Sequence, residues 1–70
     1  MTNLILTVNK DGELTEVLCK LEFCRLMRTK GLYSIEVGEH TYILTRAQWE
    51  ELEDAFLWEN KKTISMTVNG

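Results

Sequence analysis

Apolar and polar residues alternate along three stretches of the chain, and each stretch predicts a β-strand. The first covers residues 4–9 and ends in an Asn-Lys-Asp-Gly turn. The second covers residues 32–45, where Val37-Gly38-Glu39-His40 interrupts the alternation, so a β-hairpin is predicted. The third covers residues 63–68, close to the end of the sequence.

Between the hairpin and the last strand the period changes from two to that of a helix. Trp49, Leu52 and Phe56 recur at helical spacing, which predicts an amphipathic helix over residues 46–59 with these three side chains facing the core. Thr45 stands three residues before Gln48, as an N-cap does in a capping box.

Residues 13–30 carry two conflicting patterns. Leu, Glu, Lys, Arg and Met dominate the segment, its acidic residues come early and its basic residues late, and Gly31 follows it, all of which favour a helix. Val17, Cys19, Leu21 and Phe23 alternate with polar and other side chains, which favours a long bent strand.

The helical alternative, which we favour, gives the order βαββαβ, typical of a ferredoxin-like fold. The strand alternative gives an antiparallel β-meander with one helix. In both, residues 1–70 form a single α+β domain with a small antiparallel sheet of about four strands and one or two helices.

The chain has 70 residues, a net charge of −3 and no proline. The negative net charge makes nucleic-acid binding unlikely, since phosphate recognition needs a clustered positive field. Neither a signal-peptide core nor a membrane-spanning apolar run is visible. With two cysteines and no secretory signal, we expect a protein of the cytoplasm that makes no membrane contact.

Cys19 and Cys24 are the two cysteines, five positions apart. That spacing separates them by about 140° on a helix and puts them on opposite faces of a strand. We therefore expect no disulfide and no shared metal without a break in the segment. The prediction is two structural thiols, no metal site and no cofactor.

Nothing in the sequence matches a catalytic motif. His40 is the single histidine, it is expected in a turn, and no nucleophile or second titratable group stands at a defined spacing from it. The four glycines fit turns or the terminus rather than a phosphate-binding loop. We predict a protein that is not an enzyme.

The best functional candidate is the polar side of the predicted helix. Glu50, Glu51, Asp54 and Trp58 fall opposite the core-facing residues, and an indole beside carboxylates fits a protein-binding anchor. The competing interpretation is that the acids only favour the helix and that Trp58 folds back on the sheet. We expect a protein partner with a basic surface.

Two expectations rest on size alone. A 70-residue chain buries a limited core, so a homodimer that covers a sheet edge is expected. Small chains of this composition are common in phage and mobile-element genomes, which suggests an inhibitor of a host or defence protein. The alternative is a small nucleic-acid-associated or ligand-binding regulatory domain.

Overall fold

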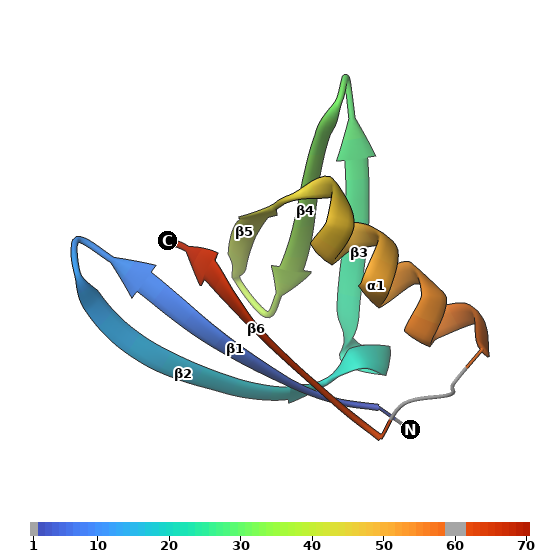
Figure 1. The fold of residues 1–70 in the computed structure, drawn as a ribbon, viewed down its shortest axis with the longest axis horizontal. Helices are drawn as coiled ribbons and strands as arrows, with labels where there is room; N and C mark the ends of the chain where they lie inside the picture. The colour runs from blue at the N-terminus through green and yellow to red at the C-terminus, as the bar shows by residue number, and fades with distance from the viewer. Residues whose placement is uncertain (1, 59–61) are drawn as a thin grey trace.

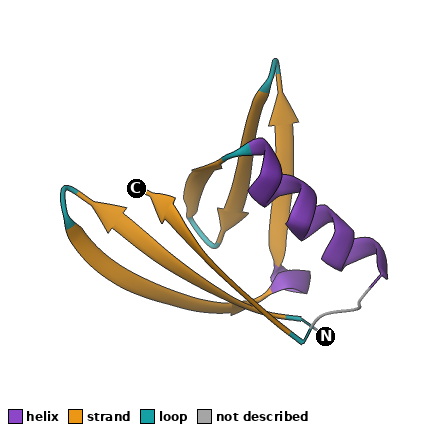
Figure 2. Ribbon diagram, viewed as in Figure 1, coloured by secondary structure: helices purple, strands orange, loops and turns teal. Residues whose placement is uncertain are grey.

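One helix lies across a curled six-stranded sheet in the computed structural model, which describes residues 2–58 and 62–70 (Figure 1, Figure 2). The elements in chain order are β1 (Asn3–Lys10), β2 (Glu13–Lys20), the 3₁₀ turn η1 (Leu21–Phe23), β3 (Cys24–Thr29), β4 (Leu32–Val37), β5 (His40–Leu44), α1 (Arg46–Trp58) and β6 (Thr63–Asn69).

The sheet has the strand order β2-β1-β6-β5-β4-β3 and consists of two halves. In the first half, β1 pairs antiparallel with β2 and parallel with β6. In the second half, β3, β4 and β5 form an antiparallel meander. The halves meet at a short seam where Ile43 of β5 pairs with Asn69 of β6. Figure 1 shows the two halves diverging from this seam, with α1 in front of the second.

The predicted α+β class with a ferredoxin-like fold is wrong, since the chain is mostly β, and so is the four-stranded antiparallel sheet. The chain forms a mixed, half-barrel sheet of six strands with a single α-helix. The error lies in residues 13–30, where we favoured a helix and the structure has β2, η1 and β3.

Two tight turns explain why residues 13–30 form strands. Asp11 and Gly12 both have positive φ, as do Lys30 and Gly31, and turns of this kind match the twist of paired strands. Each turn places the segment beside a neighbouring strand, β2 beside β1 and β3 beside β4. Pairing along whole strands outweighs a helix propensity of a few tenths of a kcal/mol per residue.

The other predicted elements are confirmed. The first strand, the hairpin and the last strand are present as β1, β4–β5 and β6, and α1 covers the predicted helix up to Trp58. Its expected last residue, 59, lies outside the described residues. The Asn9–Gly12 turn also forms, and the Gly12 backbone N–H donates to Oδ1 of Asn9 at 3.1 Å.

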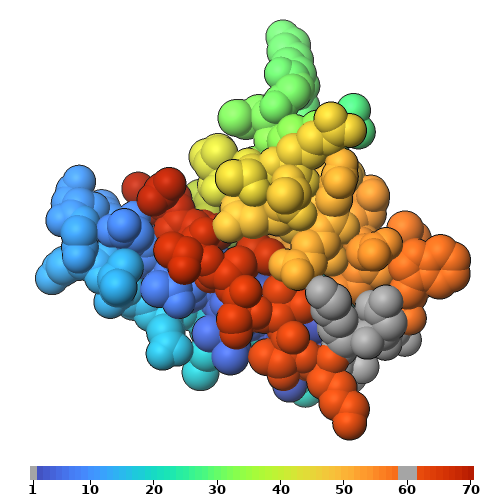
Figure 3. All heavy atoms as spheres, in the orientation of Figure 1, coloured from blue at the N-terminus to red at the C-terminus, as the bar shows by residue number. Residues whose placement is uncertain are grey.

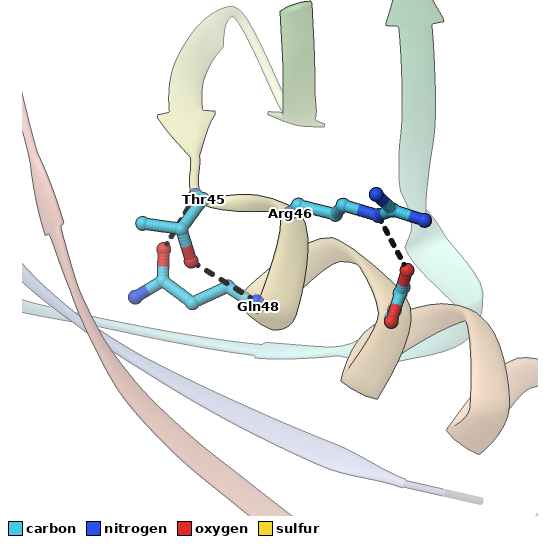
Figure 4. A network of polar contacts seen from close by, with 4 residues as sticks. Thr45, Arg46 and Gln48 are labelled. Atoms are coloured by element: carbon cyan, nitrogen blue, oxygen red, sulfur yellow. Dashed lines mark hydrogen bonds and ion pairs between the residues drawn. The ribbon is translucent and has the colours of Figure 1, made fainter.

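The predicted capping box starts α1, as Figure 4 shows. The Gln48 N–H donates to the Thr45 hydroxyl at 3.1 Å, and the Thr45 N–H donates to the Gln48 side-chain oxygen at 3.0 Å. The side-chain amide nitrogen of Gln48, Nε2, also donates to the backbone carbonyl of Thr67 in β6 at 2.8 Å. One side chain therefore caps the helix and connects it to the first half of the sheet, beside the seam.

The hydrophobic core lies on the inner face of the sheet and under α1. It draws on both halves, on η1 and on the helix, and its buried apolar residues are Leu4, Leu6, Val8, Leu21, Cys24, Ile35, Leu44, Leu52, Ala55, Ile64, Met66 and Val68. Strict alternation in β1 and β6 delivers six of these side chains to one face.

Candidate functional site

The outward side of α1 carries the four residues predicted to bind a partner. Glu50, Asp54 and Trp58 are spaced by four positions each, so they form one stripe along the helix, and Glu51 lies beside Asp54 at a spacing of three. All four are exposed. We call these four residues the acidic face of α1.

Trp58 is the most unusual member of the acidic face because 70% of its surface is exposed. It is not among the residues packed on the core, whereas the competing interpretation had Trp58 folded back on the sheet. Leu57 beside it is 69% exposed, so two large apolar side chains end the described part of the helix in solvent. In Figure 3 this end of α1, coloured orange, projects from the right-hand side of the molecule.

Glu50 has an ion-pair partner in the same helix. Nε of Arg46 donates to the Glu50 carboxylate at 2.9 Å, one turn along the helix (Figure 4). This hydrogen bond, and then the charge of Glu50, raise the pKa of Arg46 above its usual value. Arg46 therefore offsets part of the negative charge that Glu50 adds to the acidic face.

The opposite side of α1 packs on the second half of the sheet. Leu52 is fully buried, and Trp49 packs on the core with its ring centroid 5.5 Å from that of Tyr33. Arg28 in turn lies over Tyr33, 5.7 Å from the ring centroid to Cζ, in cation–π geometry. The predicted burial of Phe56 is wrong: it lies at the margin of the buried face and is partly exposed.

The cysteine pair is brought together at the corner where β2 ends and β3 begins. The Sγ atoms of Cys19 and Cys24 are 3.4 Å apart. We expected the two sulfurs to stay apart in an unbroken helix or strand. The segment is broken, because η1 inserts a 3₁₀ turn between the two strands. The turn returns Cys24 to the inner face that Cys19 already occupies.

A second exposed apolar group lies on the outer face of the first half. Leu14 and Leu18 of β2 are 66% and 69% exposed. They share one face of the strand, opposite to Val17 and Cys19, which pack against the core. Because β2 is an edge strand of the sheet, this group adjoins backbone groups that another chain can pair with.

The remaining charged and titratable groups do not form a second site. Arg25 and Arg28 are exposed on β3 and Lys30 lies in the following turn, so they do not belong to a helix C-terminus. His40 is exposed at the start of β5, near the ring of Tyr42. Across residues 2–58 and 62–70, no three His, Cys, Asp or Glu side chains are grouped so as to hold a metal ion.

Comparison with known proteins yields no relative: no family model, no curated protein and no solved structure matches the chain. Within the described part of the chain, no helix is both long and apolar enough to cross a membrane. The functional assignment therefore depends on the surface of this molecule alone.

Sequence reasoning missed the cysteine pair, although the pattern holds a signal for it. The inward positions run 17, 19, 21, 24 and 26, so one step is three residues long instead of two. An extra residue in a strand alternation indicates a bulge or corner. Leu57 was also missed, because the helical pattern was read for its core face only.

Proposed function

We propose that this chain is a non-enzymatic protein-binding module that docks on a basic surface of another protein through the acidic face of α1. The observation that carries the proposal is the 70% exposure of Trp58 at the end of the stripe formed by Glu50 and Asp54. A large exposed apolar side chain within a charged face is the informative kind of exposure.

The chemistry of the acidic face supports a division of roles. Trp is enriched among the residues that dominate binding energy, because its large ring excludes water over a wide area. Carboxylates around such an anchor attract a basic surface and speed association, with an effect that salt screens. Trp58 would be the anchor, and Glu51 and Asp54 would steer.

The helix presents this face from a fixed position. Leu52 and Ala55 hold α1 to the core, and the Thr45–Gln48 capping box fixes its first turn. A preformed surface loses little conformational entropy on binding, which favours affinity.

The experiment compares the full chain with three variants, each immobilised and exposed to nuclease-treated extract of the source cell. Trp58→Ala should weaken capture of a specific protein about 30-fold, corresponding to about 2 kcal/mol. Glu51→Lys with Asp54→Lys should slow its association at low salt and have little effect at high salt. Phe23→Ala, which removes a 76% exposed aromatic side chain from the turn between β2 and β3, is the matched control and should bind normally.

Thermal melts separate binding from folding. Trp58→Ala should melt like the parent protein, whereas Trp49→Ala, which removes the ring packed on Tyr33, should cost about 2–3 kcal/mol of stability. If Trp58→Ala binds the captured protein as well as the parent does, the acidic face is not the docking surface. If a protein is captured from untreated extract but not from nuclease-treated extract, the nucleic-acid-associated alternative takes the place of this proposal.

We also propose that two copies associate through the edge strand β2. Antiparallel pairing of two β2 strands about Glu16 places Leu14 of one copy opposite Leu18 of the other, so the four exposed leucines contact one another and lose part of their exposed surface. Sedimentation should show a dimer that Leu18→Lys converts to a monomer without lowering the far-UV signal of the fold. A monomeric parent protein at high micromolar concentration contradicts this arrangement.

On the basis of its size and composition, we further propose that the chain inhibits its partner, originates from a phage or mobile element and acts in the cytoplasm. The activity of the captured protein in the presence of the chain tests inhibition, and its compartment tests the location. The genes that neighbour the gene of this chain test the origin.

A further inference from the structure

The corner between β2 and β3 holds two free thiols in near contact. Sγ of Cys19 lies 3.4 Å from Sγ of Cys24, and Sγ of Cys24 also lies 3.5 Å from the carbonyl oxygen of Lys20. A disulfide bond is about 2.05 Å long, so the sulfurs need to approach by about 1.4 Å. Side-chain rotation and a small shift of the corner can supply this movement.

The fold holds this geometry from both sides. Lys20 and Cys24, which flank the 3₁₀ turn, both have extended backbone conformations. The alternation of inward and outward side chains therefore shifts by one residue within η1. Leu21 anchors the turn, since its side chain is buried and its N–H donates to the carbonyl of Thr2 at 2.9 Å. The two thiols are therefore held together by tertiary structure.

We infer that Cys19 and Cys24 form a reversible intramolecular disulfide by exchange with a low-molecular-weight disulfide such as oxidised glutathione. The bond would tie the end of β2 to the start of β3, which are the two edge strands of the sheet. It is a modification site separate from the acidic face of α1 and does not depend on the proposed partner.

The exchange proceeds in two balanced steps. The Cys19 thiolate attacks one sulfur of glutathione disulfide, so a mixed disulfide forms and one glutathione thiolate leaves and takes up the proton that Cys19 released. The Cys24 thiolate then attacks Sγ of Cys19, the Cys19–Cys24 bond forms, and the second glutathione leaves and takes up the Cys24 proton. The two protein thiols lose two electrons in total and the glutathione disulfide gains them.

The order of attack follows from exposure. Cys24 is 9% exposed, whereas Cys19 is only half-buried, so an external disulfide reaches Cys19 first. The pKa of Cys24 is raised to about 12, mostly by burial. The hydrogen bond to Cys19 and the charge of Cys19 make smaller contributions to this rise. Cys24 is therefore a poor first nucleophile at neutral pH, and its attack on Cys19 should quicken as pH rises.

The test equilibrates the full chain with mixtures of reduced and oxidised glutathione at mildly alkaline pH, in buffer and in denaturing urea. After acid quenching and alkylation, intact mass gives the ratio of disulfide to dithiol protein. We expect a monomeric product lighter by two hydrogen atoms, and a ratio at least about tenfold higher in buffer than in urea at the same glutathione mixture.

Thermodynamic linkage provides a second readout. Whatever factor the fold contributes to disulfide formation must also appear as added stability of the oxidised protein, and tenfold corresponds to about 1.4 kcal/mol. The oxidised protein should therefore melt several degrees higher than the reduced protein. The double variant Cys19→Ser with Cys24→Ala should show no effect of oxidant or reductant on melting.

Single variants test the order of attack. With an aromatic disulfide as the probe, Cys19→Ser should reduce the rate of the first thiol reaction at least about tenfold, and Cys24→Ala should leave it nearly unchanged. A disulfide ratio in buffer equal to or below that in urea overturns the inference. So does the accumulation of mixed disulfides or of covalent dimers in place of the internal bond.

Discussion

The two halves of the sheet are built from different kinds of contact. The second half, β3-β4-β5, is a meander of sequence neighbours joined by tight turns, and α1 packs on it. The first half, β2-β1-β6, depends on the parallel pairing of β1 with β6, which lie at opposite ends of the sequence. The strand pairing of the second half therefore depends on sequence neighbours, whereas that of the first half brings the two ends of the sequence together.

Between the halves, connections are few. Among the described residues, β5 and β6 pair at Ile43 and Asn69, and the hydrogen bond from Gln48 to Thr67 reinforces this seam. The corner η1 also joins the halves, between the edge strands β2 and β3. A shared apolar core connects the two halves where backbone pairing does not, because Leu52, Ile35 and the β1 leucines belong to one cluster.

Loss of the core contact of α1 should have the largest effect. Leu52→Ala should destabilise the protein by about 3–4 kcal/mol, since Leu52 is fully buried and leaves a cavity. Leu57→Ala is the matched control, because Leu57 lies in the same helix and is 69% exposed, and it should change stability by less than about 0.5 kcal/mol. Urea unfolding measures both. Equal losses for the two variants contradict the orientation of α1.

High pH should weaken the corner between the halves. Burial raises the pKa of Cys24 from 9.0 to about 12, so between these values the unfolded state gives up a proton that the folded state keeps. Stability is complete below pH 9 and should fall as pH rises toward 12, by at most about 1.4 kcal/mol per pH unit.

Lysine and tyrosine side chains titrate in the same range, so the comparison needs a matched variant. Cys24→Ala lacks the thiol. Between pH 9 and pH 11, its free energy of unfolding should fall by about 1–2 kcal/mol less than that of the reduced parent protein. If stability falls equally with pH in the two proteins, folding does not raise the pKa of the Cys24 thiol.

Removal of the Gln48 side chain should weaken both the helix start and the seam. Gln48→Ala loses the hydrogen bonds to Thr45 and to Thr67, with an expected cost of about 1.5–2 kcal/mol. Thr45→Ala removes the capping hydroxyl but leaves the bond to Thr67, and should cost about 1 kcal/mol. If the two variants are equally stable in urea, the bond to Thr67 contributes nothing at the seam.

The smallest effect on stability is expected at the acidic face. Trp58→Ala should change the free energy of unfolding by less than about 0.5 kcal/mol, since most of its ring already contacts solvent. Calorimetry measures this change. A loss as large as that of Leu52→Ala assigns Trp58 to the core and removes the basis of the proposed binding surface.

Elements whose signals are local could be predicted from the sequence. The Asn9–Gly12 turn, the β4–β5 hairpin and the Thr45–Gln48 capping box all form as predicted, because each depends on residues a few positions apart. The exposure of the four acidic-face residues follows from helical spacing and the position of Leu52, so the candidate site could be located from sequence.

Only the tertiary structure decided between helix and strand for residues 13–30. Local propensity favoured a helix there, but pairing of β2 with β1 and of β3 with β4 satisfies the backbone along both strands and delivers Val17, Cys19 and Leu26 to the core. The same folding brings Cys19 against Cys24 and β1 against β6. These contacts depend on how distant segments pack, and that information lies outside any local window of the sequence.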